Sequence, residues 1–292
     1  MTGAANGGLR RVGVIGCGLM GAGLAELAAR SGFEVLVAVS SDRSLRAGRE
    51  RVLGSLDRAV AKGRLDADER DAALGRLSFT DTLGELADRE LIIESVTESF
   101  AVKSKVFAAL DAVLPEDHDV VLATNTSSLA VADVAAAVRR EDLVVGTHFF
   151  NPVTTMPLVE LISSPRTAPH AAARAERFLA EGLGKRVVHA PDRPGFVVNA
   201  LLVPFMMSAI TMLESGHATA EDIDAGMTQG CGHPMGPLAL SDFTGLDTLA
   251  AVAQGLYEQS DDTRYRPPRL LLDLVTAGHL GRKSGRGFYE YA

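Results

Sequence analysis

Residues 12–32 read VGVIGCGLMGAGLAELAARSG, and this stretch decides the fold. A short apolar run leads into glycines spaced G-x-G-x-x-G, and a helical pattern follows. In a strand–turn–helix unit, the first glycine permits a tight turn, the second lets a pyrophosphate approach the backbone, and the third lets helix and strand pack closely. The helix N-terminus adds free N–H groups and a partial positive charge. The stretch predicts a dinucleotide-binding loop, although a merely tight loop remains the alternative. Its residues are Gly16, Cys17, Gly18, Leu19, Met20 and Gly21, with Cys17 expected to act as a small filler.

Outward from this loop, short β-rich runs alternate with helical patterns. Apolar runs lie at residues 33–39, 91–96, 120–124, 143–147 and 187–190. Continuous apolar strands separated by helices indicate a parallel sheet covered on both faces. A Pro/Gly break at 191–195 precedes a region that reads only as helices. We therefore predict an α/β Rossmann-type domain over residues 1–193 and an all-helical domain over residues 194–292.

Composition sets limits on the class of protein. The chain has 292 residues, of which 47% are hydrophobic and 23% charged, which is typical of a folded globular protein. The formal net charge of -8 gives no basic field for nucleic acid or an anionic membrane. Two cysteines cannot build a disulfide framework, which favours a reducing cytoplasm.

Two segments bear on targeting. The opening, MTGAANGGLRR, lacks the apolar stretch of a signal peptide, and we expect it to be a mobile tail. The most apolar segment, residues 201–213, is too short to span a bilayer and contains Pro204. We therefore expect a buried helix there and no membrane partner.

A helical pair is inserted after the second predicted strand, at about residues 42–78. One face carries apolar residues at helical spacing and the opposite face is basic. The apolar set is Leu45, Val52, Leu53, Leu56 and Val60, and the basic set is Arg43, Arg46, Arg49, Arg58 and Lys62. A minimal nucleotide fold does not need this arm, so the arm is expected to have its own task. A solvated basic face is the alternative.

Two polar segments follow predicted strands, ATNTSSL at 123–129 and HFFNPVTTMPLVE at 148–160. Open α/β sheets bind ligands at the carboxyl ends of their strands. His148 directly follows an apolar run, and Glu160 stands twelve residues later in a segment that can turn back beside it. A carboxylate against an imidazole stabilises the protonated ring and fixes its tautomer, as a general base requires. The plainer alternative is that Glu160 is a surface carboxylate.

From Arg10 to Tyr291 the chain resembles the L-3-hydroxyacyl-CoA dehydrogenases, and within them the enzymes that act on 3-hydroxybutyryl-CoA. The resemblance rests on long collinear motifs. They are the glycine loop, NTSS, HFFNPV, LVE, PGFVVNALLVP at 194–204, HPMGPLALSDFTGLDT at 233–248 and KSGRGFYEY at 283–291.

The resemblance implies a role for each matching residue. His148 would take the proton of the substrate 3-hydroxyl during hydride transfer, and Glu160 would orient His148. Ser127 and Asn199 would hydrogen-bond the reacting oxygen, with Asn151 shaping the same loop. Plainer readings are that Ser127 caps a helix near Leu129 and that Asn199 satisfies backbone. Contacts to the nicotinamide–ribose half of the cofactor would come from Glu98, Lys103 and Asn125.

The family also implies that the arm closes over the CoA nucleotide. Ser55 and Lys62 match its CoA contacts, and they stand seven residues apart, on one helix face. A homodimer through the helical domain is implied as well, although an apolar helix surface could equally be core. Chain length, physiological direction and pathway stay open.

Competing functions remain at this point. A carrier-protein thioester would present the same pantetheine arm as CoA, and a non-catalytic nucleotide binder would share the fold. A hydrolase is disfavoured because no G-x-S-x-G elbow exists, and the scattered histidines predict no metal site.

The stretch VLVAVSSDR at 35–43 bears on which nicotinamide nucleotide is the cofactor. The family usually ends this strand with an aspartate that binds the ribose, and the collinear residue here is Val39. Glu34 stands too early, before the strand, and Asp42 is expected to cap the arm's first helix. Ser40, Ser41 and Arg43 would suit a 2′-phosphate. The sequence therefore predicts NAD(P), with NADP somewhat favoured over NAD.

Overall fold

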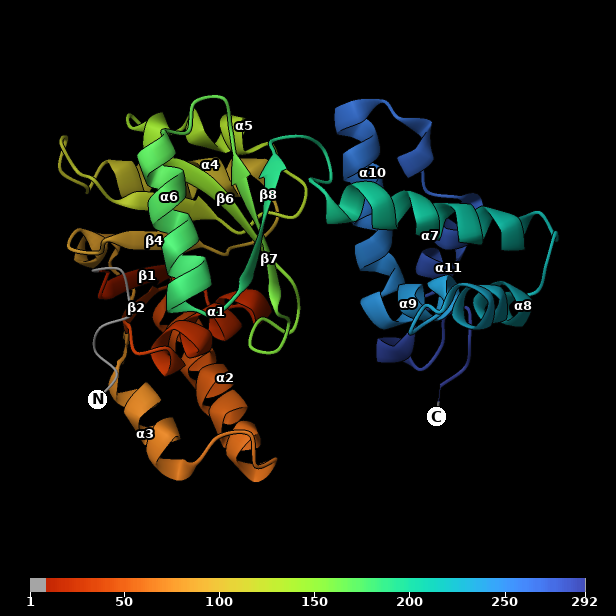
Figure 1. The fold of residues 1–292 in the computed structure, drawn as a ribbon, viewed down its shortest axis with the longest axis horizontal. Coiled ribbons are helices and arrows are strands. Elements are labelled where there is room, and N and C mark those ends of the chain that lie inside the picture. The colour runs from red at the N-terminus through yellow and green to blue at the C-terminus, as the bar shows by residue number, and fades with distance from the viewer. Residues whose placement is uncertain (1–8, 292) are drawn as a thin grey trace. The chain divides into compact units, whose positions relative to one another are not determined.

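The computed structural model describes residues 9–291, which divide into two compact units after Arg193 (Figure 1). Residues 1–8 of the predicted tail lie outside the described residues. The rest of that prediction is wrong, because Leu9 is buried in the core and Arg11 begins the first strand. Among the described residues, no helix is long and apolar enough to cross a membrane.

The first unit is built on a single sheet with the order β3-β2-β1-β4-β5-β6-β7-β8. Neighbouring strands are parallel except β6 and β7, which are antiparallel. The expected parallel sheet is thus found with one reversed strand pair. The bounds are β1 Arg11–Ile15, β2 Glu34–Ala38, β3 Leu77–Thr80, β4 Leu91–Glu94, β5 Val121–Thr124, β6 Val144–Phe149, β7 Leu158–Ser163 and β8 Arg186–Pro191.

Helices cover both faces of the sheet, as a parallel arrangement requires. Alternate side chains of the strands, such as Val12 and Val14, pack with α1 and α6 in one core. Figure 1 shows α1 and α6 on the near side of the sheet and α4 and α5 behind it. The bounds are α1 Leu19–Arg30, α4 Phe100–Asp111, α5 Val131–Ala135 and α6 Pro169–Arg177, with single turns η1 Leu83–Leu86, η2 Glu141–Leu143 and η3 Phe178–Gly182.

The inserted arm consists of α2, Asp42–Ala61, and α3, Ala67–Gly75, and leads into β3. Ser41, not Asp42, is the N-cap of α2, because its hydroxyl accepts from the backbone N–H of Ser44. Asp42 stands one position later, where its carboxylate pairs with Arg46 at 2.8 Å. The apolar stripe is narrower than predicted.

Val52 and Leu56 of the arm are buried, but the Leu53 side chain is exposed. A helix of 3.6 residues per turn places position 53 about 100° away from position 52, which explains the difference.

The second unit is helical around its own core. Its helices are α7 Val198–Glu214, α8 Ala220–Ala225, α9 Pro237–Thr244, α10 Leu246–Ser260 and α11 Arg269–Thr276, with turns η4 Gly226–Gly230, η5 Thr263–Tyr265 and η6 Arg282–Ser284. The helix predicted at 201–213 is part of α7, but it is not buried all round. Met206 and Ile210 are buried, whereas Leu201 is 73% exposed and Met212 41% exposed.

Candidate active site

His148 and Glu160 form a buried pair on adjacent strands. Both lie inside strands, so the placement of His148 just after its strand is corrected. They stand directly opposite each other in the antiparallel register of β6 and β7. The His148 Nδ1 lies 2.6 Å from the Glu160 Oε2, and the residues are 6% and 0% exposed. Facing side chains of an antiparallel pair are close neighbours, so the register itself builds this contact. Glu160 is therefore no surface carboxylate.

This pair has the geometry of an oriented general base. A carboxylate that accepts the Nδ1 proton places the basic lone pair of the imidazole on Nε2. The ring of Phe150 contacts the His148 ring, with centroids 4.6 Å apart, and limits its rotation. Burial strengthens the charged interaction between imidazolium and carboxylate when the ring is protonated.

Glu98 organises the polar loop that follows β5. Its Oε1 accepts from the Thr126 hydroxyl at 2.6 Å, the Ser127 N–H at 2.8 Å and the Ser128 N–H at 3.1 Å. Ser127 does not cap the next helix, because the first N–H groups of α5 donate to the carboxylate of Asp192. Ser127 is therefore held at the carboxyl end of β5 by a carboxylate from the neighbouring loop.

Lys103 lies beneath Glu98 and is completely buried. Its Nζ lies 2.8 Å from Glu94 Oε1 and 3.3 Å from Glu98 Oε2. Burial acts to raise the pKa of the Glu98 carboxyl, but the Lys103 charge and the hydrogen bonds from Thr126 and Ser127 outweigh it and hold this pKa below its usual value. The Lys103 ammonium is thus directed at two carboxylates, and its contact with the cofactor stays a prediction.

Asn125 ties three strand ends together. Its Nδ2 donates to the Ser95 hydroxyl at 3.2 Å, and its Oδ1 accepts from the Phe149 N–H at 3.1 Å. Its own N–H donates to the Glu94 carbonyl. Asn125 therefore fixes the ends of β4 and β6 on either side of β5, at the edge where parallel sheets bind ligands.

The glycine loop has room for a dinucleotide. Gly16 has φ +92°, and a Cβ there would lie 2.7 Å from the Ser95 carbonyl oxygen. A Cβ at Gly21 would overlap the Gly16 carbonyl, so helix and loop meet as closely as the motif predicts. At Gly18 no heavy atom lies within 4 Å of a Cβ position, which leaves open space above the loop. The loop thus fits a pyrophosphate at the N-terminus of α1.

The arm is attached to this loop by a contact that sequence reasoning missed. The Arg51 Nη1 donates to the Cys17 carbonyl at 2.6 Å. A Cβ at Gly48 would lie 2.7 Å from the Cys17 Cβ, so α2 packs directly against the loop. Burial raises the pKa of the Cys17 thiol to about 11, partly opposed by the Arg51 charge. No sequence pattern marks Arg51, since its partner is a backbone oxygen.

The end of β2 lacks the carboxylate that usually binds the ribose in NAD-binding proteins, because Val39 stands there. Val39 is buried, and its N–H donates to the Thr80 carbonyl. Glu34 is the first residue of β2 and not a residue before it, but this is still the end of the strand away from the glycine loop. Ser40, Ser41 and Arg43 are exposed at the start of α2.

The remaining predicted residues lie on three further elements. Ser55 is half-buried in α2, and Lys62 is exposed at its C-cap. Asn151 is exposed in the loop between β6 and β7. Asn199 belongs to the first turn of α7 in the second unit. Within residues 9–291, no group of three or more His, Cys, Asp or Glu side chains could hold a metal ion.

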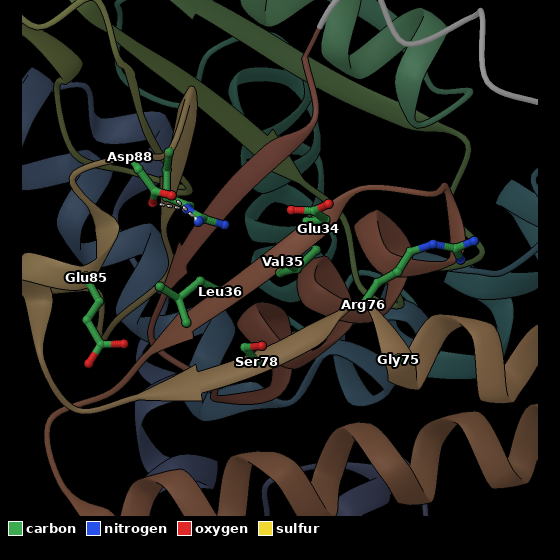
Figure 2. Close-up of a pocket in the computed structure, with 9 residues that line it drawn as sticks. Glu34, Val35, Leu36, Gly75, Arg76, Ser78, Glu85 and Asp88 are labelled. Atoms are coloured by element: carbon green, nitrogen blue, oxygen red, sulfur yellow. Dashed lines mark hydrogen bonds and ion pairs between the residues drawn. The ribbon is translucent and has the colours of Figure 1, made fainter.

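A separate cavity of about 650 Å³ does not coincide with these residues (Figure 2). It is lined by Glu34, Arg76, Glu85 and Asp88, among others, near the start of β2. Two of its carboxylates have local partners, because Asp88 pairs with Arg89 at 2.7 Å and Glu85 accepts from Thr80 at 2.9 Å. We assign it no part in the chemistry.

Comparison with known proteins agrees with this geometry. The model of the 3-hydroxyacyl-CoA dehydrogenase NAD-binding domain matches residues 11–193, and that of the family's C-terminal domain matches residues 195–291. The chain is 53% identical to a 3-hydroxybutyryl-CoA dehydrogenase of Mycobacterium tuberculosis, over 97% of this chain and 99% of the relative.

Solved structures give the same result. A crystal structure of FadB2 from M. tuberculosis superposes with a TM-score of 0.94 at 54% identity, covering 97% of this chain and 99% of that one. The (S)-3-hydroxybutyryl-CoA dehydrogenase of Ralstonia eutropha gives 0.91 at 41% identity, with the same coverage. The oxidoreductase fold, the glycine loop and the buried His148–Glu160 pair therefore have one explanation: the chain is an enzyme of the 3-hydroxyacyl-CoA dehydrogenase family.

Proposed function

We propose that the enzyme interconverts (S)-3-hydroxyacyl-CoA and 3-oxoacyl-CoA thioesters of short chain, such as 3-hydroxybutyryl-CoA and acetoacetyl-CoA. The observation that carries this proposal is the buried 2.6 Å pair of His148 and Glu160 at the carboxyl end of β6. The test is to supply acetoacetyl-CoA with a reduced nicotinamide nucleotide and to determine the configuration of the product. Formation of the (S)-alcohol supports the proposal. Nucleotide binding without turnover would instead identify a non-catalytic nucleotide binder.

In this proposal His148 moves the proton. Its Nε2 takes the proton of the 3-hydroxyl in oxidation and returns it in reduction, while Glu160 stabilises the imidazolium that forms. Proton transfer by a positioned base contributes about 10²–10⁴-fold in rate. Ser127 hydrogen-bonds the reacting oxygen from the position that Glu98 fixes for its backbone; its hydroxyl, which donates to Glu98 Oε1 at 3.2 Å in this structure, turns to the substrate instead. Asn199 is assigned the same oxygen, and Asn199→Ala should lower kcat if that assignment is right.

The cofactor is proposed to bind along the carboxyl edge of the sheet. Residues 16–21 would hold the pyrophosphate through their backbone N–H groups. Glu98, Lys103 and Asn125 would contact the nicotinamide–ribose half, with Lys103 also paired to Glu98. When bound, the nicotinamide ring accepts or supplies the hydride.

We further propose that the cofactor is NADP(H) in preference to NAD(H). Val39 removes the carboxylate that would bind a ribose hydroxyl, which costs NAD about 1.5–3 kcal/mol, or on the order of ten- to a hundredfold in affinity. The same change removes a repulsion against a 2′-phosphate of about 1–4 kcal/mol for charges ~4 Å apart. The N-terminus of α2 and the exposed Arg43 guanidinium would attract that phosphate, while Arg46 neutralises Asp42.

The comparison of kcat/KM with NADPH and with NADH tests this preference. Arg43→Ala should weaken NADPH use and leave NADH use nearly unchanged. The matched control is Arg49→Ala, an exposed arginine six residues further along α2. A higher kcat/KM with NADH, together with unchanged NADPH kinetics in Arg43→Ala, would contradict the preference.

The arm is proposed to bind the CoA nucleotide through Ser55 and Lys62. A carrier protein presents the same pantetheine but no adenine nucleotide, so comparing turnover of the two thioesters distinguishes the carriers. The relatives reported above are named for the CoA thioester.

We propose a homodimer formed by the second unit, in the cytoplasm. Large apolar side chains are exposed on three helices of that unit, with Leu201 at 73%, Phe243 at 57% and Leu272 at 45%. Such a surface is typical of an interface between subunits. Both cysteines are free thiols, which suits a reducing compartment. A monomer by light scattering at micromolar concentration would refute the dimer.

A further inference from the structure

The loop between the strands of His148 and Glu160 is held by a buried lysine outside the predicted site. Lys185 immediately precedes β8 and is only 8% exposed. Its Nζ donates to the Val153 carbonyl at 2.7 Å and to the Met156 carbonyl at 2.6 Å. Both acceptors belong to the connection, residues 150–157, that joins β6 to β7.

This ammonium is not used for an ion pair. Among residues 9–291, no carboxylate oxygen lies within 4.0 Å of the Lys185 Nζ. Burial lowers the pKa of the Lys185 ammonium below its usual value, which is the cost of keeping a charge from water. The two charge-assisted hydrogen bonds to carbonyls offset that cost and make the contact directional.

The 150–157 connection also packs against α1, the helix that follows the glycine loop. Val153 is 3% exposed, and a Cβ at Gly23 of α1 would lie 3.0 Å from the Val153 Cβ. Gly23 stands one turn into the helix that begins at the glycine loop. The connection is therefore held between Lys185 and α1, with no room for displacement toward the helix.

The first two residues of the connection lie close to His148 in the chain. Phe150 contacts the His148 ring, and Asn151 is exposed next to it. A shift of the connection would move Phe150 and Asn151 relative to His148, because they are consecutive in the chain. Misplacement by 1 Å costs on the order of 10²-fold in rate.

We propose that Lys185 is a positioning residue for the dehydrogenase reaction: it holds the 150–157 connection against α1 and thereby sets Phe150 and Asn151 beside His148. The proposal rests on the proposed function, because its kinetic readout is acetoacetyl-CoA reduction. Failure of the wild-type enzyme to reduce this substrate would refute the proposed function, whereas the variants below test Lys185.

The first variant is Lys185→Met, which keeps an unbranched side chain, one atom shorter than that of lysine, and removes the charge and both hydrogen bonds. The expected result is a kcat lower by about 10–100-fold, with the dissociation constant of the nicotinamide nucleotide changed by less than about threefold because the glycine loop is untouched. Lys185→Arg, which keeps charge and donors, should recover part of kcat. The matched control is Arg186→Gln, the exposed neighbouring residue, which should behave as wild type.

The second variant, Gly23→Ala, disturbs the connection from the opposite side without touching Lys185. Alanine has the higher helix propensity, so α1 should fold at least as well. Its methyl group forces Val153 back by a few tenths of an ångström. Scaled from the loss of about 10²-fold for a misplacement of 1 Å, kcat should fall by about 3–10-fold.

Hydrogen exchange supplies the readout that does not depend on activity. The amides of Thr155 and Met156 donate to the Pro152 carbonyl inside the connection, and their protection should fall in Lys185→Met. The proposal is overturned if Lys185→Met or Gly23→Ala folds and keeps wild-type kcat. It is also overturned if Lys185→Met lowers only the melting temperature, since Lys185 would then be merely structural.

Discussion

Replacing Glu160 by glutamine tests the oriented-base assignment most sharply, because it removes the charge and keeps the shape. The carboxylate lies 2.6 Å from the His148 Nδ1 and is wholly buried. A hydrogen bond to a charged group contributes about 1.5–3 kcal/mol, which corresponds to roughly 10–150-fold in rate. If the amide nitrogen turns toward Nδ1, the imidazole proton moves to Nε2 and the base is lost, for which a fall of up to about 10⁴-fold is expected. We therefore expect kcat for acetoacetyl-CoA reduction to fall at least about tenfold.

The chain contains a matched control for this substitution. Glu176 pairs with His189 at 3.0 Å, but the two side chains are 45% and 60% exposed. Glu176→Gln should leave kcat unchanged, because an exposed pair contributes little. Steady-state kinetics and thermal melting of both variants are the measurements. A Glu160→Gln enzyme that is folded and has kcat within twofold of wild type would refute the reasoning.

Three further predictions concern the base, the arm and the Glu98 loop. His148→Gln should bind the nucleotide normally and lose about 10²–10⁴-fold in kcat, and a near-normal kcat would remove the base assignment. Lys62→Ala should raise KM for CoA thioesters far more than for a truncated pantetheine thioester; equal effects would show that the arm does not hold the CoA nucleotide. Because the pKa of Glu98 is lowered, its stabilising contribution is present above the usual carboxyl range and is lost as pH falls through the folded pKa. Thr126→Val removes one of the hydrogen bonds that lower the Glu98 pKa. As the pH is lowered, protection of the amides of residues 127–128 from hydrogen exchange should therefore be lost at a higher pH than in wild type. The same pH dependence in variant and wild type would contradict this.

Much of the first unit could be predicted from apolar runs, because a doubly covered parallel sheet needs continuous apolar strands. β3 and β7 could not. β3 has four residues and contains Ser78, so it reads as the end of the arm. β7 carries Glu160 in its middle, and a buried carboxylate breaks the apolar pattern. Its antiparallel direction fits the short connection of residues 150–157, since a parallel pair would need a crossover of a dozen or more residues.

The candidate site was likewise predicted only in part from the sequence. Position alone predicted that the polar segment ATNTSSL, which follows a strand, faces a ligand, whereas the roles of Asn125 and Ser127 within it came only from the family resemblance. The burial of Lys103 could not be predicted, because lysine is rarely buried and only its two carboxylate partners make burial possible. Arg51 and Lys185 bind backbone carbonyls, and no side-chain pattern in a sequence marks such contacts.

The central claim is that the buried His148–Glu160 pair serves a short-chain 3-hydroxyacyl-CoA dehydrogenase. Steady-state kinetics of acetoacetyl-CoA reduction, run side by side with NADPH and NADH, test it most directly. The account predicts saturable turnover with both nucleotides and a higher kcat/KM with NADPH. Absence of turnover with either nucleotide, in an enzyme shown to bind them, would contradict it.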